Sequence, residues 1–293
     1  MEKPELLDTW RDFSDYWSQA CSKSVDKQIA LWRSIYMKKY PELLSKQLQT
    51  YEEDGLNWKE IAKKIFPSFS SRFTLMQKAR NNIIRIYKSI YSKAAETLTL
   101  HFNITFVVYV GIGCGAGWAT TYKEQPAILL GLENIAEEKW HTKQKLEGLI
   151  SHEIGHLAHM NWRGEWQMFE RAEKDPLFQL YSEGFAQRCE HIILGKEIWH
   201  LAEDKKWLPW CKRHESWLAK EFLKRIENQM AVEDFFGSWF SIQGRKQTGY
   251  FLGHEFIRVL EENRSLRKIA ILKAEDIRKL GIRYLNASTT KNL

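Results

Sequence analysis

Apolar residues recur at helical spacing through most of this chain. The first 98 residues show short periodic segments separated by Pro41, Asp54-Gly55 and Pro67, which break helices or favour turns. The longest of these segments is Phe73–Tyr91, and residues 196–280 return to the same pattern. We therefore expect the N-terminal and C-terminal parts to be helical.

Three segments between these parts have a different pattern. Ile104–Val110 is β-branched and aromatic throughout, which is typical of a buried strand. Trp118–Thr121 and Pro126–Gly131 read as two further strands, and Pro126 suits the start of an edge strand. The expected fold is α+β and predominantly helical, with a small mixed or antiparallel sheet. We place a boundary between a helical region, 1–98, and a second region, 99–293, although both could form one compact unit.

Alternating glycines follow the first of these strands, between Gly111 and Gly117. They do not fit the G-x-G-x-x-G pattern of dinucleotide-binding loops, and no G-K-[ST] follows, so a phosphate-binding loop is not expected. A turn or bulged strand that another segment approaches closely explains them better.

Residues 142–160 contain no proline and show the apolar stripe of a helix packed against a core. Thr142 can cap the start of this helix. The stripe consists of Leu146, Leu149 and Ile150. This is the helix on which we expect the sheet to pack.

The same helix contains the motif H-E-x-x-H, formed by His152, Glu153 and His156. Residues four apart lie one turn apart on one face, so both imidazoles can reach the same metal ion. Glu153 lies beside them and can act as a general base, an arrangement that suits Zn²⁺. The alternative is an ordinary core helix whose two histidines are satisfied by hydrogen bonds.

A catalytic zinc ion needs a third protein ligand and one open position. Glu183 is the candidate, because Asp175-Pro176 predicts the start of a helix that places this carboxylate beside an apolar face. A bare carboxylate is costly to bury there, and a metal would justify it. The alternative is a solvated residue or one partner of a buried ion pair.

The longer motif H-E-x-x-H-x-x-G-x-x-H does not continue in this chain, because His159 and Trp162 occupy the places of its glycine and third histidine. His159 lies about 10 Å along the helix axis from His152. We expect it to have a structural or supporting role and not to be a ligand.

Together these two helices resemble the gluzincin group of zinc metallopeptidases, and most closely a poorly characterised bacterial family of predicted zinc proteases. In that family a glycine follows the ligand Glu, as Gly184 does here, and a Gly-Tyr-x-x-Gly-like segment follows later, here Gly249–Gly253. The resemblance covers roughly residues 100–260. It implies that His152, His156 and Glu183 are the zinc ligands. It also implies that Glu153 is the base and that an edge strand, Trp118–Thr121 or Pro126–Gly131, binds the peptide substrate.

Beyond the zinc ligands and the base, three further elements of such a site can be sought in the sequence. Thermolysin-like enzymes carry an Asp four residues after the ligand Glu, where this chain has Gln187, so the partner that orients a ligand histidine must come from elsewhere. The aminopeptidase segment G-x-M-E-N is absent, which leaves exopeptidase activity without support. Tyr250 and His254 are candidate donors to the developing oxyanion. The resemblance favours Tyr250, which could equally be a core residue.

Charge, hydropathy and cysteine spacing limit the partners and the location that we expect for this protein. Basic residues near the C-terminus are interspersed with acids, as on a solvated helix, so the net charge of +7 does not predict nucleic-acid binding. No apolar run is long enough to span a membrane, and the first residues do not resemble a signal peptide. The four cysteines, Cys21, Cys114, Cys189 and Cys211, form no C-x-x-C pair and indicate reduced thiols in the cytoplasm.

The sequence thus predicts a cytoplasmic zinc peptidase that acts on a peptide or protein and interacts with neither nucleic acid nor membrane. The alternative is a catalytically inactive zincin-fold binding or regulatory protein, which the substitution at Gln187 and the uncertain oxyanion donor would suit. The oligomeric state is left open.

Overall fold

The computed structural model describes residues 4–164 and 166–290, and the chain divides into two compact units, Met1–Glu153 and Ile154–Leu293. The division falls inside helix α7 (Lys143–Arg163), which therefore carries residues of both units. The boundary expected near residue 98 does not coincide with this division. The reason is that segments from both sides of residue 98 pair in one sheet.

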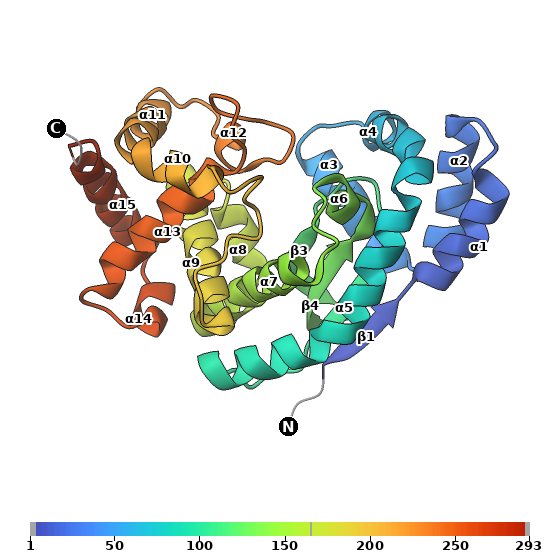
Figure 1. The fold of residues 1–293 in the computed structure, drawn as a ribbon, viewed down its shortest axis with the longest axis horizontal. Helices are drawn as coiled ribbons and strands as arrows, with labels where there is room; N and C mark the ends of the chain where they lie inside the picture. Colours follow the sequence, from blue (N-terminus) through green and yellow to red (C-terminus); the bar gives the residue numbers. More distant parts are fainter. Residues whose placement is uncertain (1–3, 165, 291–293) are drawn as a thin grey trace. The chain divides into compact units, whose positions relative to one another are not determined.

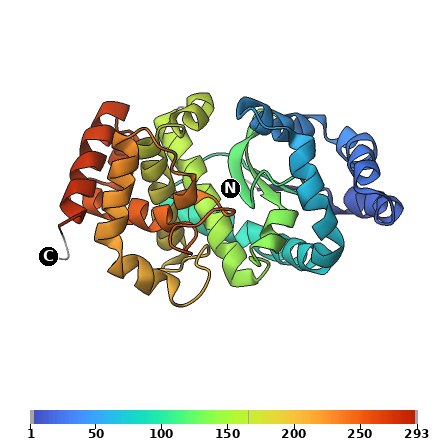
Figure 2. The ribbon, with the colours of Figure 1, turned by 90° about the horizontal axis from the view of Figure 1, so that it is seen from above.

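The first unit combines a small sheet with helices (Figure 1). Among the described residues the sheet has the strand order β1-β2-β4-β3, with β1 (Glu5–Asp8), β2 (Thr105–Tyr109), β3 (Gly117–Tyr122) and β4 (Gln125–Gly131). Its helical segments are α1 (Trp10–Ala20), α2 (Val25–Leu31), the π-helical turn η1 (Trp32–Tyr36), the 3-10 turns η2 (Met37–Lys39) and η3 (Phe66–Ser68), α3 (Pro41–Glu53), α4 (Trp58–Ile65), α5 (Phe69–Leu98) and α6 (Leu132–Glu137). Figure 2 shows the green strands with blue and cyan helices of the same unit beside them.

The sheet is mixed. β1, β2 and β4 run parallel, and β3 pairs with β4 in an antiparallel hairpin. The hairpin turns at Lys123 and Glu124, whose φ angles of 49° and 61° give the local twist that a two-residue turn needs. β3 is consequently an edge strand, whereas β4 lies inside the sheet.

The expectation that Pro126 begins an edge strand is therefore wrong. The register explains why proline is tolerated: β2 first pairs with β4 at Ala127, so Pro126 has β3 as its neighbour and lies beyond the end of β2. A missing N–H group costs little at this position. The same register removes Pro126–Gly131 from the two candidates for an edge strand and leaves β3, which contains Trp118–Thr121.

The glycine-rich segment is a close-packed turn, as expected. A Cβ atom at Gly131 would lie 2.4 Å from the carbonyl oxygen of Gly115, and Gly113 and Gly115 have φ angles of 90° and 131°. The N–H group of Gly131 donates to the carbonyl of Ala116 at 3.1 Å. Glycine is needed here both for the backbone conformation and for the absence of a side chain.

The second unit is mainly helical in its described residues, with one isolated β-bridge between Ile242 and Arg245. It contains the rest of α7 and α8 (Trp166–Ala172), α9 (Pro176–Leu194), α10 (Trp207–Arg213), α11 (Glu215–Glu227), α12 (Glu233–Phe236), α13 (Thr248–Glu261), α14 (Leu266–Ala270) and α15 (Ala274–Ser288). α13 packs along α9, with Gly184 and Gly253 at the crossing (Figure 1). A Cβ atom at Gly184 would lie 2.1 Å from the carbonyl carbon of Gly253, so the two backbones touch directly.

These elements confirm the expected fold class, α+β and predominantly helical with a small mixed sheet. All four cysteines are free thiols. In the part of the chain that the structure describes, we find no helix with the length and apolar character that crossing a membrane requires.

Candidate metal centre

Helix α7 carries the H-E-x-x-H motif as the sequence predicts. Its first turn is capped by Thr142, whose Oγ1 accepts a hydrogen bond from the N–H of Lys145 at 3.4 Å. His152, Glu153 and His156 are all buried, with exposed fractions of 3%, 7% and 8%. Three ionisable side chains on one buried helix turn are costly unless they bind something.

Helix α9 carries Glu183. Asp175 caps this helix as predicted, because its Oδ1 accepts hydrogen bonds from the N–H groups of Leu177 and Phe178 at 2.9 and 3.0 Å. The carboxylate of Glu183 faces α7, and its Oε2 lies 3.3 Å from Nε2 of His156.

The three expected ligands come together. One ligand atom each from His152, His156 and Glu183 lies within 4.8 Å of the other two. In a tetrahedral zinc site with bonds of about 2.0–2.1 Å, ligand atoms lie about 3.3 Å apart. The separation of 3.3 Å between His156 and Glu183 matches that value. The donor set of two imidazoles and one carboxylate therefore fits Zn²⁺ with one coordination position left for water or substrate.

Small residues let α7 and α9 approach. A Cβ atom at Gly155 would lie 2.8 Å from Cβ of Cys189 and 2.9 Å from Cα of Ala186. Gly155 precedes His156, and Ala186 lies three residues after Glu183, so the two helices approach each other closely next to these candidate ligands. A larger side chain at this crossing would move the carboxylate away from the imidazole.

The carboxylate of Glu153 lies against the edge strand β3. A Cβ atom at Gly117 would lie 2.4 Å from Oε1 of Glu153, and both residues belong to the first unit. Glycine at the start of β3 thus leaves the space that Glu153 occupies. This places the expected general base beside the backbone of the strand that is last in the strand order of the sheet.

Two further acids, which were not predicted from the sequence, lie near the two histidines of the motif. The first is Glu173, whose Oε1 lies 4.0 Å from Nδ1 of His156 and accepts a hydrogen bond from Oγ of Ser182 at 2.7 Å. Its carboxylate is thus close to the ring nitrogen of His156 that does not face Glu183. A carboxylate that is hydrogen-bonded to a metal-binding imidazole orients it and raises its basicity, and at 4.0 Å Glu173 lies roughly 1 Å beyond such a contact.

The second acid is Glu190, which is fully buried. Single ligand atoms of His152, Glu190 and His200 also lie within 4.8 Å of one another. The contact of 2.7 Å between Nδ1 of His200 and Oε2 of Glu190 is a hydrogen bond and is shorter than the roughly 3.3 Å expected between two zinc ligands. Glu190 and His200 therefore fit better as a supporting pair beside His152 than as a second metal site.

Gln187 is hydrogen-bonded to Glu190 of this pair. Its Nε2 donates to Oε2 of Glu190 at 3.0 Å. A buried acid, Glu190, therefore lies about one helical turn after the position at which thermolysin-like enzymes carry an Asp. Seven residues separate Glu183 from Glu190, which puts both on one side of α9. The spacing of Glu183 and Glu190 can be read from the sequence. His200 comes from the segment after α9, and no local sequence signal indicates that it lies near them.

His159 has a structural environment. It is completely buried, its ring packs against Phe185 and Phe169 at centroid distances of 4.3 and 4.8 Å, and its Nε2 lies 3.1 Å from the hydroxyl of Tyr181. Since this hydroxyl donates its proton to the carbonyl of Ile269, His159 is the donor. Burial lowers the pKa of His159 well below its usual range, with Arg163 and His156 adding to the effect.

The two candidate oxyanion donors lie on α13. Tyr250 is half-buried and packs edge-on against Phe236 at 5.7 Å. His254 is buried, with Nε2 3.0 Å from Nδ1 of His191 and Nδ1 3.0 Å from Oε1 of Glu255. Both ring nitrogens of His254 already face protein groups, whereas Tyr250 reaches the surface of the unit.

Comparisons of this chain with protein-family models, with curated proteins and with solved structures gave no match in any of the three. The gluzincin resemblance therefore rests on the motif residues themselves and on the arrangement of side chains around them.

Proposed function

We propose that this protein is a zinc-dependent peptidase of gluzincin type. The observation that carries the proposal is the convergence of His152, His156 and Glu183, of which one candidate ligand atom each lies within 4.8 Å of the other two, with both imidazoles buried. The carboxylate of Glu153 beside the edge strand adds a general base at the right place in the motif.

The chemistry of each side chain suggests its role in the reaction. A bound zinc ion would supply an acidified water and polarise the scissile carbonyl. Glu153 would accept the proton of the attacking water and return it to the leaving amine. Tyr250 is the remaining candidate for a donor to the oxyanion, because both nitrogens of His254 face other groups. Glu173 and Glu190 would hold the two imidazoles in orientation.

The edge strand β3 suggests how a substrate is held. An extended peptide can add to the free edge of a sheet through backbone hydrogen bonds, and side-chain pockets then provide selectivity. Gly117 lies on this strand next to Glu153, so a peptide paired with β3 would run past the base. Such binding favours segments of unfolded or extended protein over compact folded proteins.

The test combines metal analysis with a cleavage assay. We expect the purified chain to contain one zinc ion and to cleave members of a peptide library, with cleavage sites read by mass spectrometry. Glu153→Gln should abolish cleavage and retain zinc, whereas Glu183→Gln should lose both. Glu147→Gln on the same helix is the matched control and should leave both unchanged. A chain without stoichiometric zinc would falsify the proposal. Tight zinc binding without any cleavage would instead favour an inactive binding or regulatory protein.

A further inference from the structure

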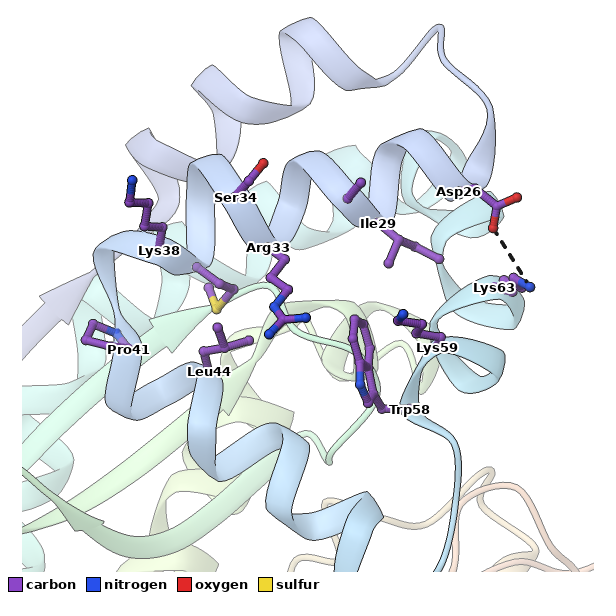
Figure 3. A pocket seen from close by; sticks show the side chains of 12 residues that line it. Asp26, Ile29, Arg33, Ser34, Lys38, Pro41, Leu44, Trp58, Lys59 and Lys63 are labelled. Atoms are coloured by element: carbon purple, nitrogen blue, oxygen red, sulfur yellow. Dashed lines mark ion pairs between the residues drawn. The ribbon is translucent and has the colours of Figure 1, made fainter.

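The first unit contains a cavity of about 710 Å³ between α2, η1, α3 and α4 (Figure 3). Its volume is within the range of roughly 300–1,000 Å³ that is typical of sites for small organic ligands. The cavity is far from the H-E-x-x-H motif in sequence and shares no lining residue with the candidate metal centre.

The floor of the cavity is aliphatic. Ile29 and Met37 are buried and Leu44 is half-buried, and these three apolar side chains line the space from three segments of the chain. The unbranched thioether side chain of Met37 adapts its shape, which suits an alkyl chain better than a rigid ring.

Trp58 forms one wall and holds two cations beside the cavity. The guanidinium carbon of Arg33 lies 6.0 Å from the centroid of the Trp58 ring, and Nζ of Lys59 lies 5.7 Å from it. Such cation–π contacts stabilise the two charged groups near the indole. Figure 3 shows Arg33 reaching from its helix toward Leu44 and Trp58.

The charge of the lining is unbalanced. Lys38 and Lys63 add two further cations, and among the described residues that line the cavity Asp26 alone is acidic. Asp26 pairs with Lys63 at 3.8 Å, and Lys63 also contacts Glu60 at 3.0 Å. Within the described part of the chain, no carboxylate pairs with the charged groups of Arg33 and Lys59. A planar guanidinium above an apolar floor fits a carboxylate, which it can bind through two parallel hydrogen bonds.

We propose that this cavity binds an alkyl carboxylate of medium chain length, with the carboxylate on Arg33 and Lys59 and the alkyl chain over Ile29, Met37 and Leu44. This site is independent of the peptidase proposal, because it requires neither the metal nor any residue of the H-E-x-x-H helix.

The test is calorimetric titration of the full chain with sodium dodecanoate at pH 8 and low salt, alongside dodecanol and dodecylamine. We expect one dodecanoate per chain and affinities for the alcohol and the amine that are weaker by about tenfold or more, since neither can form the charge-assisted pair with Arg33. Arg33→Gln should weaken dodecanoate binding by about tenfold, and Leu44→Asp should abolish it by placing a like charge on the floor. Lys27→Gln is the matched control, because Lys27 is exposed on α2 outside the lining.

Circular dichroism establishes that each variant is folded, and Lys59→Gln replaces Arg33→Gln if the latter is not. Equal binding of dodecanoate and dodecanol, no saturable binding of dodecanoate, or equal affinities in Arg33→Gln and Lys27→Gln would each overturn the proposal. Titration in the presence of EDTA separates this cavity from the metal centre. Binding that EDTA abolishes and that Arg33→Gln leaves unchanged would assign the carboxylate to the metal and refute the cavity site.

Discussion

Replacing Gly184 by alanine should loosen the second unit and weaken metal binding together. The added Cβ atom would lie 2.1 Å from the carbonyl carbon and 2.2 Å from the carbonyl oxygen of Gly253. Non-bonded carbon atoms prefer separations of about 3.5–4.0 Å, so α9 and α13 would have to move apart by roughly 1 Å or more. The obstacle is backbone on a facing helix, which cannot turn away as a side chain can.

The change in the free energy of unfolding caused by Gly184→Ala has two opposing contributions. Overpacking typically costs about 1–3 kcal/mol, and a clash with backbone falls at the upper end of that range. Alanine in a helix recovers about 1 kcal/mol relative to glycine. The net loss is about 2 kcal/mol, which corresponds to a decrease of roughly 4–8 °C in Tm.

The variant should also bind zinc more weakly, because Glu183 precedes Gly184. Metal sites tolerate shifts of about 0.2 Å, and a displacement of α9 by several times that amount should reduce affinity by about tenfold or more. Thermal unfolding followed by circular dichroism and zinc competition with a chelator measure the two effects.

Gly281→Ala on α15 is the matched control. Its Cβ atom would lie 3.0 Å from Cδ2 of Leu177, a side-chain methyl group that can move, so Tm should stay unchanged or rise. Equal Tm values for Gly184→Ala and the unmodified chain would refute the argument that direct backbone contact determines this helix crossing.

Three further predictions concern other parts of the chain. Glu190→Gln should lower zinc affinity by about tenfold by weakening the support of His152, whereas the exposed Glu197→Gln should not, as chelator competition would show. Gly117→Ala should reduce peptide cleavage while zinc is retained, because its Cβ atom would lie 2.4 Å from Oε1 of Glu153; unchanged cleavage would contradict the placement of the base. Burial raises the pKa of Glu133 to about 7, so the folded protein keeps a proton that the unfolded chain releases near pH 4.5. The free energy of unfolding should therefore fall as pH rises from about 4.5 to about 7. Glu133→Gln should raise Tm at pH 8 and have little effect at pH 4. Melting curves of the variant and the unmodified chain at these two pH values would show the difference.

Local signals in the sequence determined several features of this protein correctly. Thr142 and Asp175 mark the starts of α7 and α9, because a side-chain oxygen at a helix N-terminus satisfies free N–H groups without help from distant residues. The spacing of four between His152 and His156 places both imidazoles on one face, since helix geometry alone sets that relation. The periodic segment Phe73–Tyr91 likewise lies within α5.

Other features depended on contacts between segments distant in the chain. The strand β1 was missed because its four residues pair with β2, about a hundred positions later, through backbone groups that every residue carries. The same lack of local information concealed that β4 lies inside the sheet and β3 at its edge.

The polar residues around the candidate metal centre also come together through contacts between distant segments. Glu173, Glu190 and His200 are ordinary polar residues in the sequence, and only the fold brings them close to the two imidazoles. The approach of α7, α9 and α13 depends on Gly155, Gly184 and Gly253, whose missing side chains matter only because another helix occupies the space. A single sequence specifies helix faces through its periodicity, but the pairing of faces arises from packing, which has no local signature.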